Sequence, residues 1–587
     1  MDNRNLILAI ALSVAIVFIY EWQFAPKPPP PSEVAGAEQT QAPKGGEAAR
    51  EVPVPGRAAT EADAPRPSAD VAAGDSSAAE GLSRAAAIAA KPRLAIDSSQ
   101  LHGSIALTGA RIDDLTLAGY RETVDRDSPE IILLSPQDAT NAYYAYFGWV
   151  GEGDIAVPGP DTVWTADRDV LVPDSPVTLS WENGEGLRFV QIIALDRNYM
   201  FTVIQRVVNT TGVPVSVFPF GLVSRRGTPE VSRFFILHEG LLGVFNGTLD
   251  EVDYDDIQDA GAITEKTTGG WIGITDKYWL TALIPDQQTE VSTRFLHRLA
   301  DGNDRYQADF LRPALAVPPR GAAEATSRLF AGAKEVALLD GYAETYAIEL
   351  FDRAIDFGWF YFLTKPIFYV LIYLNSQVGN FGLAILLLTV IIKLAFFPLA
   401  NKSYTSMSKM KKLQPEMLKL RERFGDDRSR MNQEMMALYK REKANPASGC
   451  LPMFIQIPVF FALYKVLFVT IEMRQAPFYG WIHDLSAPDP TSVFNLFGLI
   501  PWEPALYLPE VVNIGVWPLL MGFTMWLQQR LNPQPADPIQ AKVFMFLPIM
   551  FTFLLARFPA GLVIYWAWNN LLSIIQQKVI MIRMGVT

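Results

Sequence analysis

One cation interrupts an otherwise apolar run of the chain, and this residue has the clearest chemical potential. Lys393 lies inside the apolar segment 381–399, and Thr389 stands one helical turn earlier on the same face. If Asn401 marks the membrane boundary, Lys393 lies about 12 Å from it at 1.5 Å per residue. An ammonium at that depth costs about 3 kcal/mol. It either extends towards Asn401 to reach the surface or lines a hydrated groove, where it would attract an acidic group.

Polar side chains recur at helical spacing in the last apolar segment, 562–582, and Gln528 adds another amide from the region before it. Such residues commonly form hydrogen bonds between membrane helices. Because they accompany an intramembrane cation, their number favours a water-filled groove instead. The groove residues that we predict are Lys393, Thr389, Trp566, Asn569, Asn570, Ser573 and Gln528.

Long apolar segments concentrate at the N-terminus and after residue 350, which predicts a membrane protein. The run 6–20 is followed by Trp22 and Phe24, which suit an interfacial anchor. A cleaved signal peptide is the alternative, but only Arg4 precedes the run and no small-residue cleavage site follows it directly. The predicted spans of the C-terminal part are 381–399, 451–471, 511–527, 543–558 and 562–582, which with the anchor make six transmembrane α-helices.

Basic residues are distributed unequally between the loops, and this predicts the orientation. The segment 400–449 is rich in lysine and arginine, whereas 472–510 holds only Arg474. By the positive-inside rule, the first loop is cytoplasmic and the second lies outside. The N-terminus would then be cytoplasmic as well, and the region between the anchor and the spans would lie outside.

The region between the anchor and the spans divides into two parts. Residues 26–91 are rich in Pro, Ala, Glu, Gly and Ser and cannot bury a core, so we expect a disordered tether. From 92 to 347, alternating apolar residues and frequent turn signals, as in 187–193, 199–208 and 215–220, predict a large antiparallel β-sandwich. The predicted domains are the anchor 1–25, the tether 26–91, the β-sandwich 92–347, and a membrane core 348–587 with an interfacial helix at 351–375.

The cytoplasmic loop 400–449 has the pattern of a helical hairpin. Its two helices would meet near residues 425–427, and Asp427 or Ser429 can cap the second helix. The hairpin is rich in methionine, which either packs the two helices together or offers an adaptable apolar surface for varied hydrophobic segments. The predicted contact residues are Met407, Met410, Met417, Met431, Met435 and Met436.

Composition excludes several classes of function. The net charge of −12 argues against nucleic-acid binding, and a single cysteine, Cys450, permits no intrachain disulfide. The four histidines are far apart in the sequence, and there is no phosphate-binding GxxxxGK[ST] loop. We therefore expect no metal and no cofactor.

Several motifs in the last 230 or so residues resemble those of one known family. They are the runs Ser403–Glu416 and Gln433–Lys440, Asn445-Pro446 with Gly449–Pro452, Arg474–Pro477, Trp481–Ser486 and Phe558–Gly561. The chain is similar here to the YidC/Oxa/Alb family of membrane protein insertases. The anchor, tether and large external domain resemble the Gram-negative branch of that family, whose external domain has a sugar-mutarotase-like sandwich fold.

The resemblance implies a bacterial inner-membrane insertase and chaperone that is not an enzyme. Its partners would be nascent membrane proteins, the lipid bilayer, the Sec translocon and the ribosome. In the family, a basic residue at the position of Lys393 lines a groove open to the cytoplasm; it is usually arginine. Trp566 stands where tyrosine is common, and the short C-terminus lacks the basic tail that helps many relatives to contact the ribosome.

Two other functions compete with this interpretation. A secondary transporter could use Lys393 as a substrate or proton site, although the five spans show no internal repeat. The β-sandwich could be a carbohydrate-processing enzyme, although fold alone does not give function and no convincing catalytic pair is present.

Overall fold

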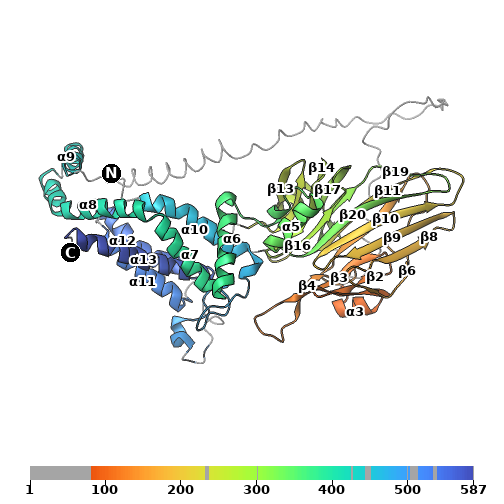
Figure 1. The fold of residues 1–587 in the computed structure, drawn as a ribbon, viewed down its shortest axis with the longest axis horizontal. Helices are drawn as coiled ribbons and strands as arrows, with labels where there is room; N and C mark the ends of the chain where they lie inside the picture. Colours follow the sequence, from red (N-terminus) through yellow and green to blue (C-terminus); the bar gives the residue numbers. More distant parts are fainter. Residues whose placement is uncertain are drawn as a thin grey trace. The chain divides into compact units, whose positions relative to one another are not determined.

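The structure is a computed structural model. It describes residues 81–231, 237–300, 302–424, 427–442, 451–498, 500, 502, 513–532 and 538–585. The predicted anchor and the tether up to residue 80 lie outside these residues, as does Cys450. Residues 65–587 belong to one compact unit. Within its described part, strands dominate up to residue 333 and helices follow (Figure 1).

Two β-sheets form the first part, as the alternating sequence pattern predicts. Among the described residues, the larger sheet has 11 strands, in the order β14-β17-β18-β11-β5-β3-β2-β1-β7, with β4 beside β3 and β19 beside β11. Apart from the short parallel pair β1 and β7, its ladders are antiparallel. Its strands are β1 (Arg93–Asp97), β2 (Leu101–Ala106), β3 (Arg111–Arg121), β4 (Glu130–Leu134), β5 (Tyr143–Gly151), β7 (Val170–Leu171), β11 (Val215–Arg226), β14 (Ala262–Thr268), β17 (Glu290–Ala300), β18 (Asn303–Leu311) and β19 (Leu315–Val317).

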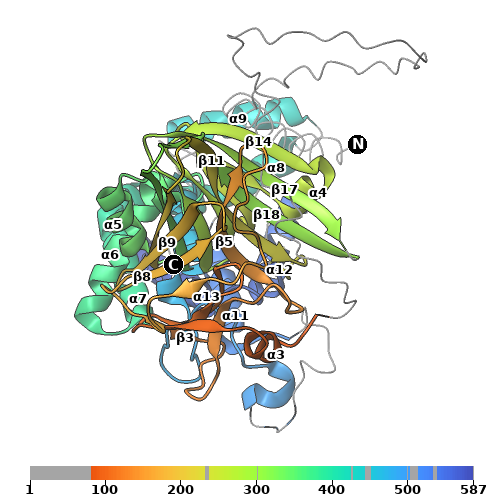
Figure 2. The same cartoon turned by 90° about the vertical axis from the view of Figure 1, so that its right-hand side faces the viewer.

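The second sheet has 9 strands among the described residues, in the order β13-β12-β15-β16-β20-β10-β9-β8-β6, and it is antiparallel. Both sheets contribute to one apolar core, so the domain is a sandwich (Figure 2). Gln191 and Gln205 cross this core and donate to backbone carbonyls of β5. Its strands are β6 (Thr165–Ala166), β8 (Val177–Glu182), β9 (Leu187–Leu195), β10 (Met200–Asn209), β12 (Gly240–Phe245), β13 (Thr248–Val252), β15 (Trp271–Thr275), β16 (Trp279–Ile284) and β20 (Ala322–Ala333).

The described residues extend the β domain to an earlier position than the predicted boundary. Helix α3 (Arg84–Ala89) lies within the predicted tether, and Leu82 bridges to Ala139. The side chain of Ser83 caps this helix, and Arg84 pairs with Asp114 of β3. These contacts hold the chain against the sheet, so a tether that ends at residue 91 is too long by about one helix.

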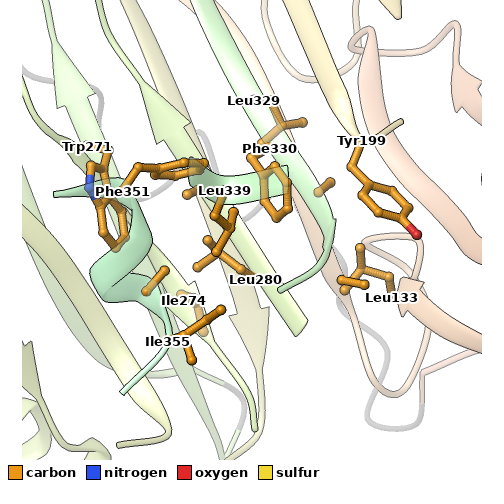
Figure 3. Close-up of a cluster of buried hydrophobic side chains, with 14 of the residues drawn as sticks. Leu133, Tyr199, Trp271, Ile274, Leu280, Leu329, Phe330, Leu339, Phe351 and Ile355 are labelled. Carbon is orange, nitrogen blue, oxygen red and sulfur yellow. The ribbon is translucent and has the colours of Figure 1, made fainter. Parts of the chain in front are cut away.

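Aromatic and aliphatic side chains bury the segment that leaves the β domain. Helix α5 (Val336–Tyr346) and the 3-10 turn η2 (Phe351–Ala354) pack on the second sheet. The ring of Phe351 lies 5.4 Å from that of Trp271 and 5.5 Å from that of Phe330, both edge-on, and Leu339 completes the cluster (Figure 3). This packing makes the start of the C-terminal region continuous with the core of the sandwich.

The segment predicted as one interfacial helix, 351–375, is divided in the structure. The η2 turn is followed by irregular backbone, with Gly358 at φ +70°, and α6 (Tyr361–Val378) begins only after it. The acids in this segment bind cations on other elements. Asp352 accepts from Lys365 at 2.8 Å, and Asp356 pairs with Lys465 at 2.7 Å. These side-chain pairs stabilise the irregular backbone between η2 and α6.

Helices occupy the remaining predicted segments. They are α7 (Phe381–Ala395), α8 (Phe397–Phe424), α9 (Arg428–Arg441), α10 (Leu451–Val469), α11 (Val516–Leu531), α12 (Pro538–Leu555) and α13 (Ala560–Arg583), with a seven-residue helix α4 (Tyr254–Ala260) in the β domain and short 3-10 turns η4 (Ile471–Met473) and η5 (Val493–Gly498). In the described part of the chain, no helix taken singly combines the length and the apolar character needed to cross a bilayer. By length and composition alone, the bent pair of α7 and α8 does so when the two are counted together.

A bend of 70° separates α7 from α8, so the predicted span 381–399 ends early, at Ala395. Pro398 explains the break. Proline has no backbone N–H to donate to residue 394, and its ring clashes with that carbonyl, but it is tolerated in the first turn of a new helix.

Polar contacts join the β domain to the loop that follows α10. The backbone N–H of Val336 donates to Glu472 Oε1 at 3.1 Å, and Arg474 donates to the carbonyl of Arg121 at 2.6 Å. The ammonium of Lys277 lies 3.7 Å from the centre of the Phe468 ring. The second carboxylate oxygen, Glu472 Oε2, is buried and has no hydrogen-bond partner among the described residues. Burial therefore raises the pKa of Glu472 to about 7, and the charge of Glu335 adds to the shift.

This junction predicts a pH-dependent stability. The pKa of Glu472 in the folded state lies above its ordinary value of 4.5. Its contribution to the free energy of unfolding is therefore fully present below pH 4.5 and is lost as pH rises through about 7. Glu472→Gln should remove this dependence, which we place at about 1–3 kcal/mol. The measurement is the thermal midpoint of the purified full chain between pH 5 and pH 8. Glu344→Gln, on the exposed face of α5, is the control and should keep the parent profile. If the thermal midpoint of Glu472→Gln depends on pH as that of the parent does, Glu472 is not the titrating group.

Candidate functional site

The ammonium of Lys393 is held by a hydroxyl on another helix. Lys393 Nζ on α7 donates to Ser573 Oγ on α13 at 2.7 Å, and Ser573 Oγ donates in turn to the carbonyl of Asn569 at 2.8 Å. Ser573 is almost fully buried, and Lys393 is half-buried. No carboxylate within the described ranges pairs with Lys393. One hydroxyl therefore accepts from a cation that has no countercharge in this part of the molecule.

A small cavity opens beside this cation. Its volume is about 40 Å³, which has room for roughly one to three water molecules. Most of the lining is apolar, and the polar groups are Lys393, Tyr404 and Gln456. The Gln456 amide donates to the hydroxyl of Tyr565, which links α10 to α13. The lining residues are Ile392, Lys393, Phe396, Leu399, Ala400, Tyr404, Gln456 and Val459.

The polar residues of α13 face two different neighbours. Ser573 meets α7, whereas Asn570 donates to Thr524 of α11 at 3.4 Å and Gln577 donates to Asn532 at 3.1 Å. The last two contacts are the interhelical hydrogen bonds that such residues commonly make. Asn569 is also buried, and its backbone carbonyl accepts from Ser573.

The other predicted groove residues lie in different surroundings. Thr389 is buried, and its hydroxyl donates to the carbonyl of Ile385 in its own helix at 2.7 Å. Trp566 stacks on Phe460 of α10, with ring centres 4.3 Å apart. Gln528 is half-buried on α11, and no contact between described residues joins it to Lys393. Of the predicted set, Ser573 is the residue whose side chain forms a hydrogen bond with Lys393 among the described residues.

Sequence reasoning did not select Gln456 or Tyr404. Gln456 is the polar residue of an otherwise apolar stretch of α10, two positions before Pro458, and this interruption was a usable signal. Tyr404 belongs to the amphipathic start of α8, where its aromatic ring gave no distinguishing signal.

The helical hairpin forms as predicted, with Asp427 as the cap of α9. The backbone N–H of Arg430 donates to Asp427 Oδ1 at 3.0 Å. Met407 and Met410 are buried against Ile580 of α13 and Leu438 of α9, so these two methionines pack the structure together. Met417 accepts from the Tyr439 hydroxyl at 3.5 Å. The three methionines of α9 are more open: Met431 and Met435 are half-buried and Met436 is 50% exposed.

Comparisons with known proteins identify the chain. Residues 93–370 match the family model described as the YidC periplasmic domain, and residues 373–586 match that of the 60Kd inner membrane protein. A curated relative from Beijerinckia indica, named Membrane protein insertase YidC, is 54% identical over 514 residues, which cover 86% of this chain and 85% of the relative. The chain belongs to the YidC family of membrane protein insertases.

Another YidC relative, from Granulibacter bethesdensis, is 56% identical over 499 residues, covering 84% of this chain and 86% of the relative. A solved structure titled "Active YidC insertase crystal structure with the first transmembrane domain resolved" is 17% identical and covers 83% of this chain and 92% of that chain, with a TM-score of 0.35. The YidC relatives make the function membrane protein insertion at the inner membrane, and a secondary transporter is not favoured.

The bond between Lys393 and Ser573 can be measured by a double-mutant cycle. Ser573→Ala should lower the free energy of unfolding by about 1–3 kcal/mol, because it leaves the ammonium without its acceptor. In Lys393→Met the same serine substitution should cost less, which gives a coupling energy of about 1–2 kcal/mol. The measurement is chemical unfolding in detergent, with Ser376→Ala on α6 as the control. Strict additivity of the two substitutions would contradict the bond.

Proposed function

We propose that Lys393 and the adjoining cavity form the receiving end of a hydrophilic groove that opens to the cytoplasm. The single observation that supports this is an ammonium on the apolar helix α7 whose hydrogen-bond acceptor is a neutral hydroxyl, with no carboxylate paired to it among the described residues. Such a cation attracts an acidic group more strongly in low-dielectric surroundings than in water. The hydrophilic tail of a nascent membrane protein supplies that group.

The predicted domain order and topology complete the proposal. The anchor 1–25 and the tether 26–80 place the β domain in the periplasm, α6 lies at the interface, and α7 and α10–α13 cross the membrane with the hairpin on the cytoplasmic side. The hairpin is rich in basic residues, whereas the loop 472–510 has almost none, and this difference supports the orientation. Insertion then needs no hydrolysed nucleotide, because the apolar segment of the client moves from the groove into lipid. The protein acts alone or beside the Sec translocon, and it receives chains from the ribosome.

The other predicted groove residues act in two ways under this proposal. Ser573 and Asn569 hold the Lys393 ammonium in place, whereas Thr389, Trp566, Asn570 and Gln528 form the surrounding walls. The hairpin surface that contacts clients is confined to Met431, Met435 and Met436, because Met407, Met410 and Met417 are used in packing.

The charge of Lys393 is the first test. Lys393→Arg should retain insertion activity. Lys393→Ala and Lys393→Glu should reduce the insertion of clients with acidic N-terminal tails by about tenfold, which corresponds to about 1.4 kcal/mol. Clients with neutral tails should be affected less. The measurement is insertion into liposomes that contain the purified full chain, with protease protection as the readout. Equal insertion of acidic-tailed clients by Lys393→Glu and the parent would exclude the electrostatic role.

The hairpin surface gives a second test. A photocrosslinking residue at Met436 should capture stalled nascent chains, because half of this side chain is exposed. Met436→Ser should reduce client insertion without lowering stability, whereas Met410→Ser, inside the packed cluster, should lower the thermal midpoint. Client crosslinks from the exposed Leu418 of α8, with none from Met436, would move the contact surface to α8.

A further inference from the structure

A second cavity lies between the end of α11 and the start of α12. Its volume is about 300 Å³, at the lower end of the range of roughly 300–1,000 Å³ that small-ligand sites occupy. The Gln529 amide donates to the carbonyl of Phe544 and so joins the two helices across it. None of its lining residues is shared with the cavity at Lys393. The lining residues are Trp526, Gln529, Arg530, Ala541, Lys542 and Met545.

The polar part of this cavity is cationic. The guanidinium of Arg530 lies 4.2 Å from the centre of the Trp526 ring, and the Arg530 side chain is exposed on α11. Lys542 faces the same cavity from α12. Neither cation pairs with a carboxylate in the described residues, and α11 and α12 contain no Asp or Glu. Asp537, in the connection between them, lies outside the described residues. Two cations without a described countercharge suit an anionic ligand.

The surroundings of the cavity indicate what carries the anion. Large apolar side chains of the same two helices are exposed next to it: Phe523 is 58% exposed, Phe544 44% and Phe546 59%. A free anion would gain nothing from these side chains. A molecule with an anionic head and apolar chains would meet the cations with its head and the aromatic residues with its chains.

We propose that this cavity binds the headgroup of an anionic phospholipid of the cytoplasmic leaflet. The leaflet rests on the topology given under the proposed function, whereas the binding chemistry rests on the cavity alone. The Arg530 guanidinium and the Lys542 ammonium bind the phosphate, Trp526 lies against the glycerol region, and the acyl chains extend along α12. The site ties α11 to α12 through lipid at the end where the Gln529 bond also joins them.

The test is lipid retention by the purified full chain in native mass spectrometry, with phosphatidylglycerol compared with phosphatidylethanolamine. The double variant Arg530→Gln with Lys542→Gln should retain phosphatidylglycerol at least about fivefold less than the parent, and phosphatidylethanolamine equally. The matched control is Lys578→Gln with Arg583→Gln, which removes two exposed cations of α13 that do not line the cavity. It should change retention less than about twofold. Ala541→Phe fills the cavity without changing charge and should reproduce the loss.

Four results would overturn the proposal. They are parent-like retention in the double variant, an equal loss in the control pair, displacement of the lipid by inorganic phosphate at millimolar concentration, and competition by an RNA oligonucleotide. The first would show that the lipid binds elsewhere, the second would indicate general charge attraction, the third a site for free anions, and the fourth a nucleic-acid surface. Folding of each variant is checked by its thermal midpoint.

The experiment separates this proposal from the proposed function. Lipid retention does not depend on client insertion, so an inactive Lys393 series leaves it unchanged. The leaflet is measured independently, with a membrane-impermeant thiol reagent on Lys542→Cys in a Cys450→Ser background. Labelling in inverted vesicles and not in right-side-out vesicles supports the cytoplasmic leaflet, and the reverse pattern excludes it.

Discussion

The hydrogen bond from Lys393 to Ser573 is the contact on which the arrangement of the helices depends. An ammonium among apolar helices is costly unless an acceptor reaches it, and in this chain the acceptor comes from a helix 180 residues further along. Together with Trp568, whose ring N–H donates to the carbonyl of Leu386 at 3.3 Å, the contact sets which face of α13 meets α7. Other polar residues of α13 reach α11, where Asn570 and Gln577 form their own bonds. The polar side chains of the last helix are thus shared between α7, α10 and α11.

Helix α10 connects this site with the β domain. Its first half contributes Gln456 to the cavity at Lys393 and Phe460 to the stack on Trp566. Its last turns contribute Lys465 and Phe468, which contact Asp356 and Lys277, and Glu472 follows directly. A shift of α10 along its axis would therefore change its contacts at the Lys393 cavity and its contacts with the β domain together. The helical region and the β domain share this one element.

Local patterns in the sequence predicted the elements well, and contacts between distant elements poorly. The alternation in 187–209 predicted β9 and β10, and the interruption near residue 425 predicted the hairpin, because these signals depend on neighbouring residues. The sequence offered Asp427 or Ser429 as the cap of its second helix, and Asp427 is the one that caps α9. Lys393 was recognisable because a charge in an apolar run is rare. Its acceptor was not, since several polar residues of α13 were equally suitable. The bend at Pro398 had a visible signal, yet the apolar run continued through it and concealed the end of α7.

The buried methionines at the base of the hairpin have a mechanical consequence. Contacts with α13 hold α8 as far as Leu413. The helix then continues to Phe424, about 16 Å further at a rise of about 1.5 Å per residue. This stretch, where Met417 meets Tyr439 of α9, is a cantilever. A cantilever converts a small rotation at its support into a larger displacement at its free end: a tilt of about 10° at Leu413 would carry Phe424 roughly 3 Å sideways. The lever arm, and with it the reach of the hairpin, is determined by where the buried residues of α8 stop.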